Sequence, residues 1–246
     1  MRQITVTEII RQYKLGFREF KNAHIKPGSL AKKRLSKLNL DGSEVVNCDF
    51  RRAIIQRGSF NASIMRDSNF QGANLANSEF KGTDLRGSNF KGVDLSGVDF
   101  SWAKLEGVEF TSSIIVGANF AGSNLNGTTF INANLKGCNF SSTKLDKANF
   151  TKAESQKADY SFATLNGAIF YQADLSGSDF SQAELENSDF RETNLASVNF
   201  YEANLRNASL EGADPGKLWW KAKFSLANLE GVILPGGRIF GEVGTS

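Results

Sequence analysis

Asn69 to Phe150 reads, in groups of five, NFQGA NLANS EFKGT DLRGS NFKGV DLSGV DFSWA KLEGV EFTSS IIVGA NFAGS NLNGT TFINA NLKGC NFSST KLDKA NF. A large apolar residue stands at every position whose number ends in 0 or 5. A small residue stands two places before it, and Gly often stands two places after it. Side chains repeat every two residues along a strand and every 3.6 along a helix, so a repeat of five fits neither element. The chain must therefore turn a corner in every repeat.

The five-residue phase holds from Leu40 to Leu210 without a slip. Between Phe50 and Phe200 the positions ending in 0 are Phe, with Tyr160 as the one exception, and the positions ending in 5 are mostly Leu. The true period is therefore ten residues. The small residues two places before each large one are short enough to point inward beside it, so both are expected in the core.

One pair of repeats departs from this rule, because Ser155 replaces Leu and the next large residue is Tyr160. A buried hydroxyl without a partner costs roughly 1–3 kcal/mol. One hypothesis links the two hydroxyls inside the coil, directly or through one water. The alternative is a local bulge that turns Ser155 outward, and the sequence leaves both open.

Four triplets, Ala73–Leu75, Ala133–Leu135, Ala173–Leu175 and Ala203–Leu205, read ANL or ADL. They resemble the A(D/N)LXX motif of the pentapeptide-repeat family, and the resemblance covers residues 17–240. Members of this family fold as right-handed quadrilateral β-helices with four pentapeptides per coil. The resemblance therefore implies an all-β solenoid of about ten to eleven coils, stacked at about the 4.8 Å spacing of paired strands. The opening segment, EIIRQYKLGFREF, is similar to the helical cap of cyanobacterial members.

Residues 1–16 are expected to form an N-terminal helical cap. Four apolar residues in this segment have the spacing of one helix face: Val6, Ile9, Ile10 and Tyr13. Thr5 followed by Glu8 fits a capping box, and Gly16 is a natural stop. Because the open end of a repeat stack must be covered, this helix is interpreted as the cover of the first coil.

The β-helix is expected over residues 17–240, and it begins irregularly. Residues 26–38 contain Pro27 and place Leu38 at a small-residue position, so they predict a distorted first coil or a short excursion. A cluster of basic residues in this segment is interpreted as a solvated charged edge: Lys26, Lys32, Lys33, Arg34 and Lys37.

The phase breaks again within residues 211–220 and then resumes one place early. The later apolar positions are Phe224, Leu229, Leu234 and Ile239. Pro215–Gly216 indicates a loop or a changed corner. Trp219 is expected in the core of the last coil, Trp220 is expected to face a loop or solvent, and residues 241–246 form a polar tail.

No catalytic, cofactor-binding or metal-binding constellation is expected. His24 is the only His, which excludes a multi-His metal site and argues against a His-based triad. Cys48 and Cys138 occupy inward positions about 20 Å apart along the axis. A disulfide needs Cα atoms within about 7 Å, so both are expected to be buried free thiols. Asp and Glu mostly precede a large residue, where their side chains bond local backbone, and no Gly cluster opens a helix as a phosphate loop would.

The net charge of +3 is mild and does not argue for direct nucleic-acid binding. No apolar run approaches the roughly 18 residues of a membrane span. The first residues lack the apolar region and the cleavage site of a secretory signal. The sequence therefore predicts a cytoplasmic protein with no membrane segment, no cofactor and no small-molecule substrate.

Exposed apolar residues at outward positions are the features that would mark a partner surface. With twenty residues per coil they fall on three sides: Trp102, Phe162 and Tyr201 on one, Ile131, Ile169 and Tyr171 on the opposite one, and Ile54, Ile114 and Val116 on a third. Scattered surface apolar residues are normal. The cluster of Ile131, Ile169 and Tyr171 is therefore favoured as a partner surface, and Trp102 and Phe162 are the second candidates.

The resemblance implies a non-catalytic scaffold for protein–protein interaction, regulatory in some cyanobacterial members, that binds an unidentified protein as a monomer or a weak dimer. The alternative is a DNA mimic that binds a topoisomerase such as DNA gyrase, as in the quinolone-resistance members. Such mimics have an acidic surface, whereas this chain has a sequence pI of about 8.8 and no side with a continuous acidic stripe. A structural or stress-related protein without a single partner is a third interpretation.

Overall fold

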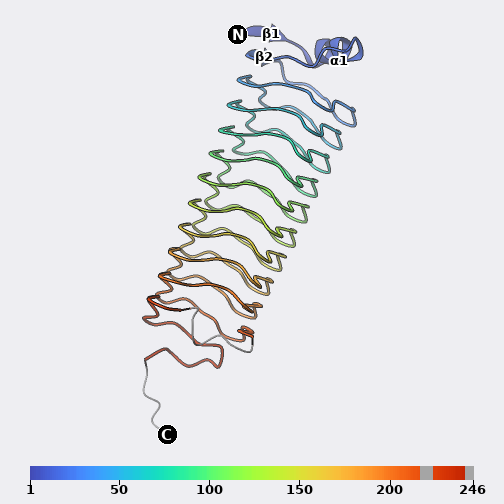
Figure 1. Cartoon of the computed structure of the whole chain (residues 1–246). Helices are drawn as coiled ribbons and strands as arrows, with labels where there is room; N and C mark the ends of the chain where they lie inside the picture. Colours follow the sequence, from blue (N-terminus) through green and yellow to red (C-terminus); the bar gives the residue numbers. More distant parts are fainter. Residues whose placement is uncertain (217–223, 242–246) are drawn as a thin grey trace.

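The computed structural model describes residues 1–216 and 224–241, and the chain forms a rod of stacked coils (Figure 1). Among the described residues, the regular elements lie at the N-terminal end. They are β1 (Arg2–Ile4), α1 (Val6–Lys14) and β2 (Ala23–Ile25). The following residues wind coil after coil along the rod, from blue to red in Figure 1. The expected β-helix is therefore the architecture of the chain.

Each coil contains twenty residues, as the backbone pairing shows. Residues one place before each large core residue form single parallel bridges with residues twenty places later, from Glu19 with Asn39 to Asn194 with Asp214. The bridges fall on four ladders that start five residues apart, so each coil has four sides. Counted from Glu19 onward, each ladder contains ten or eleven described residues.

A tight turn closes each five-residue repeat. The N–H three places after a core residue donates to the carbonyl of that residue, as from Ala53 to Phe50 at 2.9 Å. The residue two places after each core residue has a positive φ, for instance +66° at Gly72, and this conformation favours Gly. Asn or Asp one place before it accepts a turn N–H, as Asn89 does from Lys91 at 2.9 Å. The predicted bonds from Asp to the local backbone are confirmed, as from the Arg51 N–H to Asp49 at 3.0 Å, and Asn makes them as well. Glu79 at this position bonds the Asn61 side chain instead.

Aromatic rings fill the interior in two stacked columns. Phe70 stacks on Phe90 with ring centroids 4.6 Å apart, and Phe80 stacks on Phe100 at 5.1 Å. Rings of the two columns meet edge to face, as Phe80 and Phe90 do at 6.4 Å. Both arrangements are favourable for aromatic pairs, and each buried ring contributes on the order of 1.5–3 kcal/mol to stability. The ten-residue period of the sequence is thus the alternation of the two columns with Leu.

The hydroxyl groups of Ser155 and Tyr160 are paired directly inside the core. Their oxygens lie 2.7 Å apart, and both residues are fully buried. The ring of Tyr160 keeps its place between Phe140 and Phe180, with centroids 4.9 and 4.6 Å away. Ser155 also keeps the regular backbone bond to the next coil, from its N–H to the carbonyl of Asp174 at 2.8 Å. The paired-hydroxyl hypothesis is therefore confirmed, and the bulge that would turn Ser155 outward is wrong.

The N-terminal cap consists of α1 together with β1. The Thr5 hydroxyl accepts the Glu8 N–H at 3.2 Å, as in the predicted capping box, but the Glu8 carboxylate bonds Arg11 instead of returning to Thr5. Ile9 is fully buried against the first coil, and the Tyr13 hydroxyl donates to the Ser36 carbonyl at 3.0 Å. β1 pairs in parallel with β2, which extends the backbone ladder by one step.

Residues 26–38, expected as a distorted coil or an excursion, keep the twenty-residue pairing. Ser29 bridges Asp49, and Arg34 bridges Ile54. Leu38 is fully buried at its small-residue position. The next residue in its column is Gly58, where an added Cβ would come within 2.9 Å of side-chain atoms of Ile55 and Phe60.

Beyond Leu210 the coil contains four extra residues. Asn204 pairs with Asn228, which lies 24 places later instead of twenty. This insertion explains why the phase resumes one place early, and Phe224 then stacks on Phe200 at 5.0 Å. Trp219 and Trp220, for which the sequence predicted a core and a loop position, lie outside the described residues.

Candidate interaction surfaces

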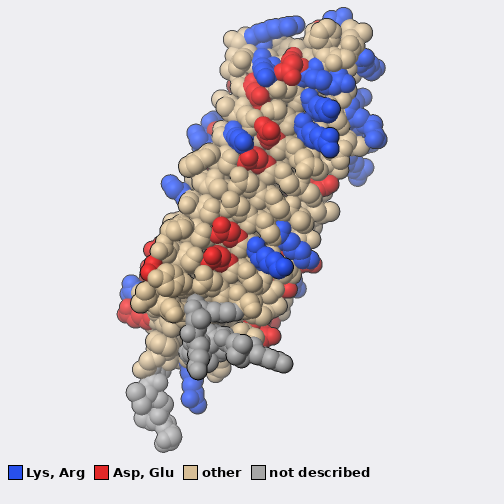
Figure 2. Space-filling view, viewed as in Figure 1, with Lys and Arg blue, Asp and Glu red and all other residues tan. Residues whose placement is uncertain are grey.

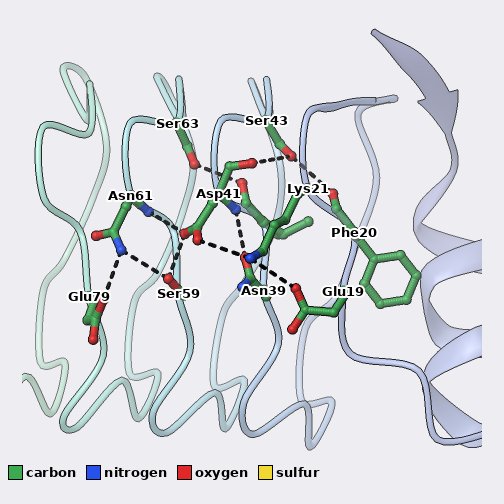
Figure 3. Close-up of polar contacts among 11 residues, drawn as sticks. Glu19, Phe20, Lys21, Asn39, Asp41, Ser43, Ser59, Asn61, Ser63 and Glu79 are labelled. Carbon is green, nitrogen blue, oxygen red and sulfur yellow. Dashed lines mark hydrogen bonds and ion pairs between the residues drawn. The ribbon is translucent and has the colours of Figure 1, made fainter.

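Polar side chains at one corner link consecutive coils, as Figure 3 shows. The Asp41 carboxylate accepts hydrogen bonds from the Ser59 hydroxyl at 2.6 Å and from the Asn61 N–H at 2.8 Å. The Asn61 side chain repeats this arrangement one coil later and accepts the Lys81 N–H at 2.9 Å. Because turn N–H groups need acceptors, these corner acids and amides are used to hold the coils together.

The titratable groups form no metal or nucleophile site in the part of the chain that the structure describes. No group of three or more His, Cys, Asp or Glu there could hold a metal ion. His24 is partly exposed, with Nδ1 2.9 Å from the Glu44 carboxylate. Cys48 and Cys138 are buried free thiols, as predicted. Burial raises the pKa of both, to about 12 at Cys138, so neither is an ionised nucleophile at neutral pH.

Trp102 and Phe162 project from one corner of the rod and are 72% and 60% exposed. Each stands two places after a core residue, with φ of 61° and 59°, a conformation that bulky residues rarely adopt. The Trp102 indole lies over Gly122 one coil further on. A Cβ added to Gly122 would come within 2.7 Å of its ring atoms. Tyr201, 40% exposed, lies beside the same corner nearer the C-terminus. We call Trp102, Phe162 and Tyr201 the aromatic edge.

The favoured cluster of Ile131, Ile169 and Tyr171 is less exposed than its spacing predicts. Ile169 is 36% exposed, whereas Ile131 and Tyr171 are half-buried. Arg191 covers part of Tyr171, with its guanidinium carbon 5.7 Å from the ring centroid. Ile169 and Tyr171 line a hollow of about 770 Å³, which we call the acidic hollow, and Ile131 is not part of the lining. The remaining lining residues are Asn149, Thr151, Asp189, Arg191, Glu192, Glu211 and Gly212.

A second hollow, of about 550 Å³, lies on the same corner nearer the N-terminus, and we call it the basic hollow. Its lining contains four cations and no acid: Ala31, Lys32, Arg51, Arg52, Gln71, Gly72, Lys91, Gly92 and Ser112. Lys32 was expected on a solvated charged edge, and the hollow itself was missed from the sequence. A usable signal is present, because Arg51 and Arg52 stand twenty places after Ala31 and Lys32 and therefore lie beside them.

An arginine that lines each hollow, Arg51 or Arg191, forms the same carboxylate–guanidinium fork with the aspartate two places before it. Arg51 donates from Nε and Nη2 to the two oxygens of Asp49, both at 2.9 Å. Arg191 repeats this with Asp189 at 2.9 and 2.7 Å. The arginine lowers the pKa of Asp49 to about 2. At Asp189 burial raises the pKa, but the bonds to Arg191 lower it by more, so the pKa lies below its ordinary value. The hollows differ in the charges that surround this shared fork.

Comparison with known proteins agrees with this architecture. A model described as a pentapeptide repeat region matches residues 45–110 and 63–140. A second model, pentapeptide repeats (8 copies), matches residues 143–182, 156–191 and 178–214. Comparison with curated proteins gives no match.

Among solved structures, HetL from the cyanobacterium Nostoc sp. strain PCC 7120 is 25% identical with a TM-score of 0.69, over 96% of this chain and 99% of HetL. Full-length QnrB1 is 22% identical with a TM-score of 0.51, over 86% of this chain and 93% of QnrB1. A helix with the length and apolar character of a membrane span is not found among residues 1–216 and 224–241. The repeated coils, the turns and the matches over residues 45–214 together show that the chain belongs to the pentapeptide-repeat family.

Proposed function

We propose that this chain is a non-catalytic interaction scaffold whose protein partner docks on the aromatic edge. The observation that carries the proposal is the exposure of Trp102 and Phe162 at left-handed corner positions. A non-Gly residue in this conformation costs on the order of 1 kcal/mol, and strained residues cluster at functional sites. Nothing in the fold requires an aromatic residue there, since Gly82 and Gly92 occupy equivalent corners with the same sign of φ.

The geometry of the edge suits a binding anchor. Large aromatic residues dominate the energy of many protein interfaces, where they enter pockets of the partner. Trp102 is already supported by Gly122, so it loses little side-chain freedom when it binds. Trp102 and Phe162 lie three coils apart, or about 14 Å at the spacing of paired strands, which matches two anchors within one interface.

The family context is consistent with this role. Pentapeptide-repeat proteins are generally non-catalytic, and the described coils of this chain are filled by a packed aromatic core. HetL, the similar solved structure at 25% identity, is a pentapeptide repeat protein involved in heterocyst differentiation regulation. A regulatory rod acts by presenting surface to another protein, which is the action that we propose here.

The charge pattern disfavours the alternative of a rod-long DNA mimic that binds DNA gyrase. Residues 1–66 contain 14 Lys and Arg but only 5 Asp and Glu. Residues 158–216 contain 10 Asp and Glu but only 2 Lys and Arg. A mimic of duplex DNA needs negative charge along its whole length, because the duplex carries one charge per about 1.7 Å. QnrB1, a plasmid-mediated fluoroquinolone resistance protein, shares the fold with this chain, and the likeness goes no further.

The proposal is tested by affinity capture from the native cell extract with two surface variants. Trp102→Asn with Phe162→Asn removes the edge and keeps residues that tolerate a positive φ. Ile169→Asp with Tyr171→Asp changes the acidic hollow and serves as the matched control. We expect a partner that is lost only with the first variant. Each truncated anchor should weaken binding by about 2 kcal/mol, or about thirtyfold.

Three other outcomes would contradict the proposal. A partner lost only with the second variant would place docking at the acidic hollow. Capture of gyrase subunits, with inhibition of supercoiling by the purified protein, would support the mimic. A captured set that is the same for the wild type and both variants would show that neither surface is used.

A further inference from the structure

Five cations lie on one side of the rod and on its two bordering corners, over two adjacent coils near the N-terminus. We call Lys32, Arg34, Lys37, Arg52 and Arg57 the basic face, and all five side chains are exposed. No Asp or Glu occurs within residues 26–40 or 50–66. Figure 2 shows how Lys and Arg gather over the N-terminal coils. Among the described residues, the ion pairs nearest to this surface use Lys21, Arg51 and Arg66 and leave these five cations without an acidic partner.

Four of these cations occupy corner positions with a positive φ. Lys32, Lys37, Arg52 and Arg57 have φ values of 60°, 61°, 56° and 56°. A long charged side chain gains nothing for the turn in this conformation, and Gly would be less strained. Other corners of the rod carry Asn, Ser or Glu in the same conformation, so what sets these four positions apart is their shared positive charge.

The complementary charge lies at the other end of the same side. The bridge ladder that starts at Arg34 ends at Asp214, so these residues lie on one side of the rod. Glu192 and Glu211 flank Asp214 on the corner that Lys32 and Arg52 occupy near the N-terminus. We call Glu192, Glu211 and Asp214 the acidic face. All three are exposed, and the ion pairs of described residues around them involve Asp189, Glu186 and Glu230 instead.

The two faces of one molecule cannot meet. Arg34 and Asp214 are nine coil steps apart, or about 43 Å at the spacing of paired strands. A second copy placed antiparallel against this side satisfies both faces at once. We propose that the partner of the basic face is the acidic face of a second copy of this chain, in an antiparallel two-fold dimer.

The two-fold geometry fixes which residues meet. The two-fold axis lies in the interface and runs perpendicular to the rod. It reverses the order of the coils in the second copy and places each corner of one copy opposite the same corner of the other. Arg34 then faces Asp214, Arg52 faces Glu192 and Lys32 faces Glu211, and symmetry makes each contact twice. Near the centre of the same ladder, Ile114 is 51% exposed and adds apolar area close to the axis.

Two like-charge approaches limit the strength of the dimer. Arg51 faces Arg191, although each is already paired with an Asp, and two acids also approach each other. Asp94 faces Glu154 near the axis, although Lys136 already lies 2.6 Å from the Glu154 carboxylate. Because the attractive contacts are exposed charges, salt screens them, with a Debye length of about 10 Å at 0.1 M. A dimer that forms at low salt and dissociates at high salt is therefore expected. The aromatic edge lies on another corner and stays open, so this dimer and the partner binding proposed above succeed or fail separately.

A charge swap tests the dimer by sedimentation velocity at roughly 20 mM and at about 0.5 M salt. The first variant carries Lys32→Glu, Arg34→Glu and Arg52→Glu, and the second carries Glu192→Lys, Glu211→Lys and Asp214→Lys. In a dimer of either variant alone, like charges would face each other at both contacts, so each variant should be monomeric. An equimolar mixture restores both contacts and should form the heterodimer. The wild type should dimerise at low salt about tenfold or more strongly than either variant.

A third variant controls for net charge. Lys104→Glu, Lys144→Glu and Lys147→Glu changes the charge by the same amount as the first variant, on exposed residues of other sides. It should dimerise as the wild type does, and circular dichroism should show that every variant keeps the fold. A further variant, Asp94→Lys, replaces the approach of two acids by attraction to Glu154 and should strengthen the dimer.

The proposal fails if the wild type is monomeric at the low salt concentration, or if the mixed variants do not associate. It also fails if the third variant loses the dimer to the same extent as the first. A labelled single-stranded oligonucleotide is titrated in parallel. Steep salt-dependent binding of this probe by a monomeric wild type would identify the basic face as a phosphate-binding surface and would overturn the dimer.

Discussion

The interior and the corners of this rod use the same five-residue repeat in opposite ways. In the interior one residue type returns coil after coil, as in the stacked and fully buried Phe60 and Phe80. At the corners the position two places after each core residue keeps one backbone conformation but changes its side chain. Lys32, Gly92 and Trp102 have φ values of 60°, 64° and 61° and share no chemistry.

The difference shows how a uniform fold can carry an individual function. The turn hydrogen bond and the inter-coil bonds involve backbone atoms, so they do not depend on which side chain stands at the corner. A side chain that points into the core, in contrast, must match the volume of the residues above and below it. Changes in the interior should therefore be costly, and changes at a corner should cost little unless they touch a neighbour.

The largest effect is expected at the Ser155–Tyr160 pair, where the interior departs from its own rule. Tyr160→Phe leaves the Ser155 hydroxyl without its partner, and Ser155→Ala does the same to Tyr160. Each change should lower the free energy of unfolding by about 1–3 kcal/mol, as measured by urea denaturation. The double variant should lose less than the sum of the two, because it leaves no buried hydroxyl unpaired.

Moving the pair by one coil provides the control. Phe140→Tyr alone adds a hydroxyl opposite Leu135 and should destabilise the rod, whereas Phe140→Tyr with Leu135→Ser should recover part of that loss. If Tyr160→Phe unfolds at the same urea concentration as the wild type, the hydroxyl pair contributes nothing to stability. Substitution of a buried residue would then cost as little stability as substitution of a corner residue.

A smaller effect is expected at Gly122, where a corner does touch a neighbour. Gly107→Ala and Gly122→Ala both place a Cβ at a positive φ, of 68° and 69°, and each should cost about 1 kcal/mol. Only at Gly122 would the new Cβ meet the Trp102 ring, at 2.7 Å. Gly122→Ala should therefore cost about 1 kcal/mol more in thermal unfolding. The excess should disappear in a Trp102→Gly background, and equal losses for the two Gly variants would show that the ring moves freely.

The sequence predicted the interior well because a fixed period leaves each position one role. Once the phase was read, the buried Cys48 and Cys138 followed from position alone. For Ser155 the sequence left an inward and an outward position open, and the structure places it inward, beside Tyr160. The short strand β1 was not predicted, since Arg2–Ile4 precedes the repeats and has no phase of its own. It pairs with β2 because the first coil exposes an unsatisfied backbone edge.

The corner surfaces were predicted less well, because the period gives the side of a residue and not what covers it. Ile131 and Tyr171 were placed on the correct side, yet both are half-buried, and Arg191 stacks over Tyr171. The exposure of Trp102 depends on where its ring rests, which the spacing does not specify. The basic hollow arises from side chains of several coils around one corner, and a linear sequence shows these side chains as separate residues.

The smallest effect is expected at the two Asp–Arg forks whose arginines line the hollows, and it depends on pH. Arg51 lowers the pKa of Asp49 from the ordinary 3.8 to about 2. Because the folded-state pKa lies below the unfolded one, the ionised carboxylate stabilises the fold above pH of about 4, and this contribution is lost as the pH falls through about 2. Asp49→Asn should therefore lower the free energy of unfolding by about 0.5–1 kcal/mol at neutral pH, since the pair is partly exposed.

The difference between Asp49→Asn and the wild type should shrink in urea denaturation as the pH falls from about 4 to about 2. Asp189→Asn, seven coils further along the same corner, is the matched variant and should change in the same direction, because Arg191 lowers the pKa of Asp189 as well. A difference that stays constant with pH would mean that the fork acts through its hydrogen bonds alone. An equal loss of unfolding free energy in the two variants would show that the fork stabilises the fold to the same extent among basic neighbours, near Asp49, and among acidic neighbours, near Asp189. The opposite charges of the hollows would then be free to serve binding without disturbing the fold beneath them.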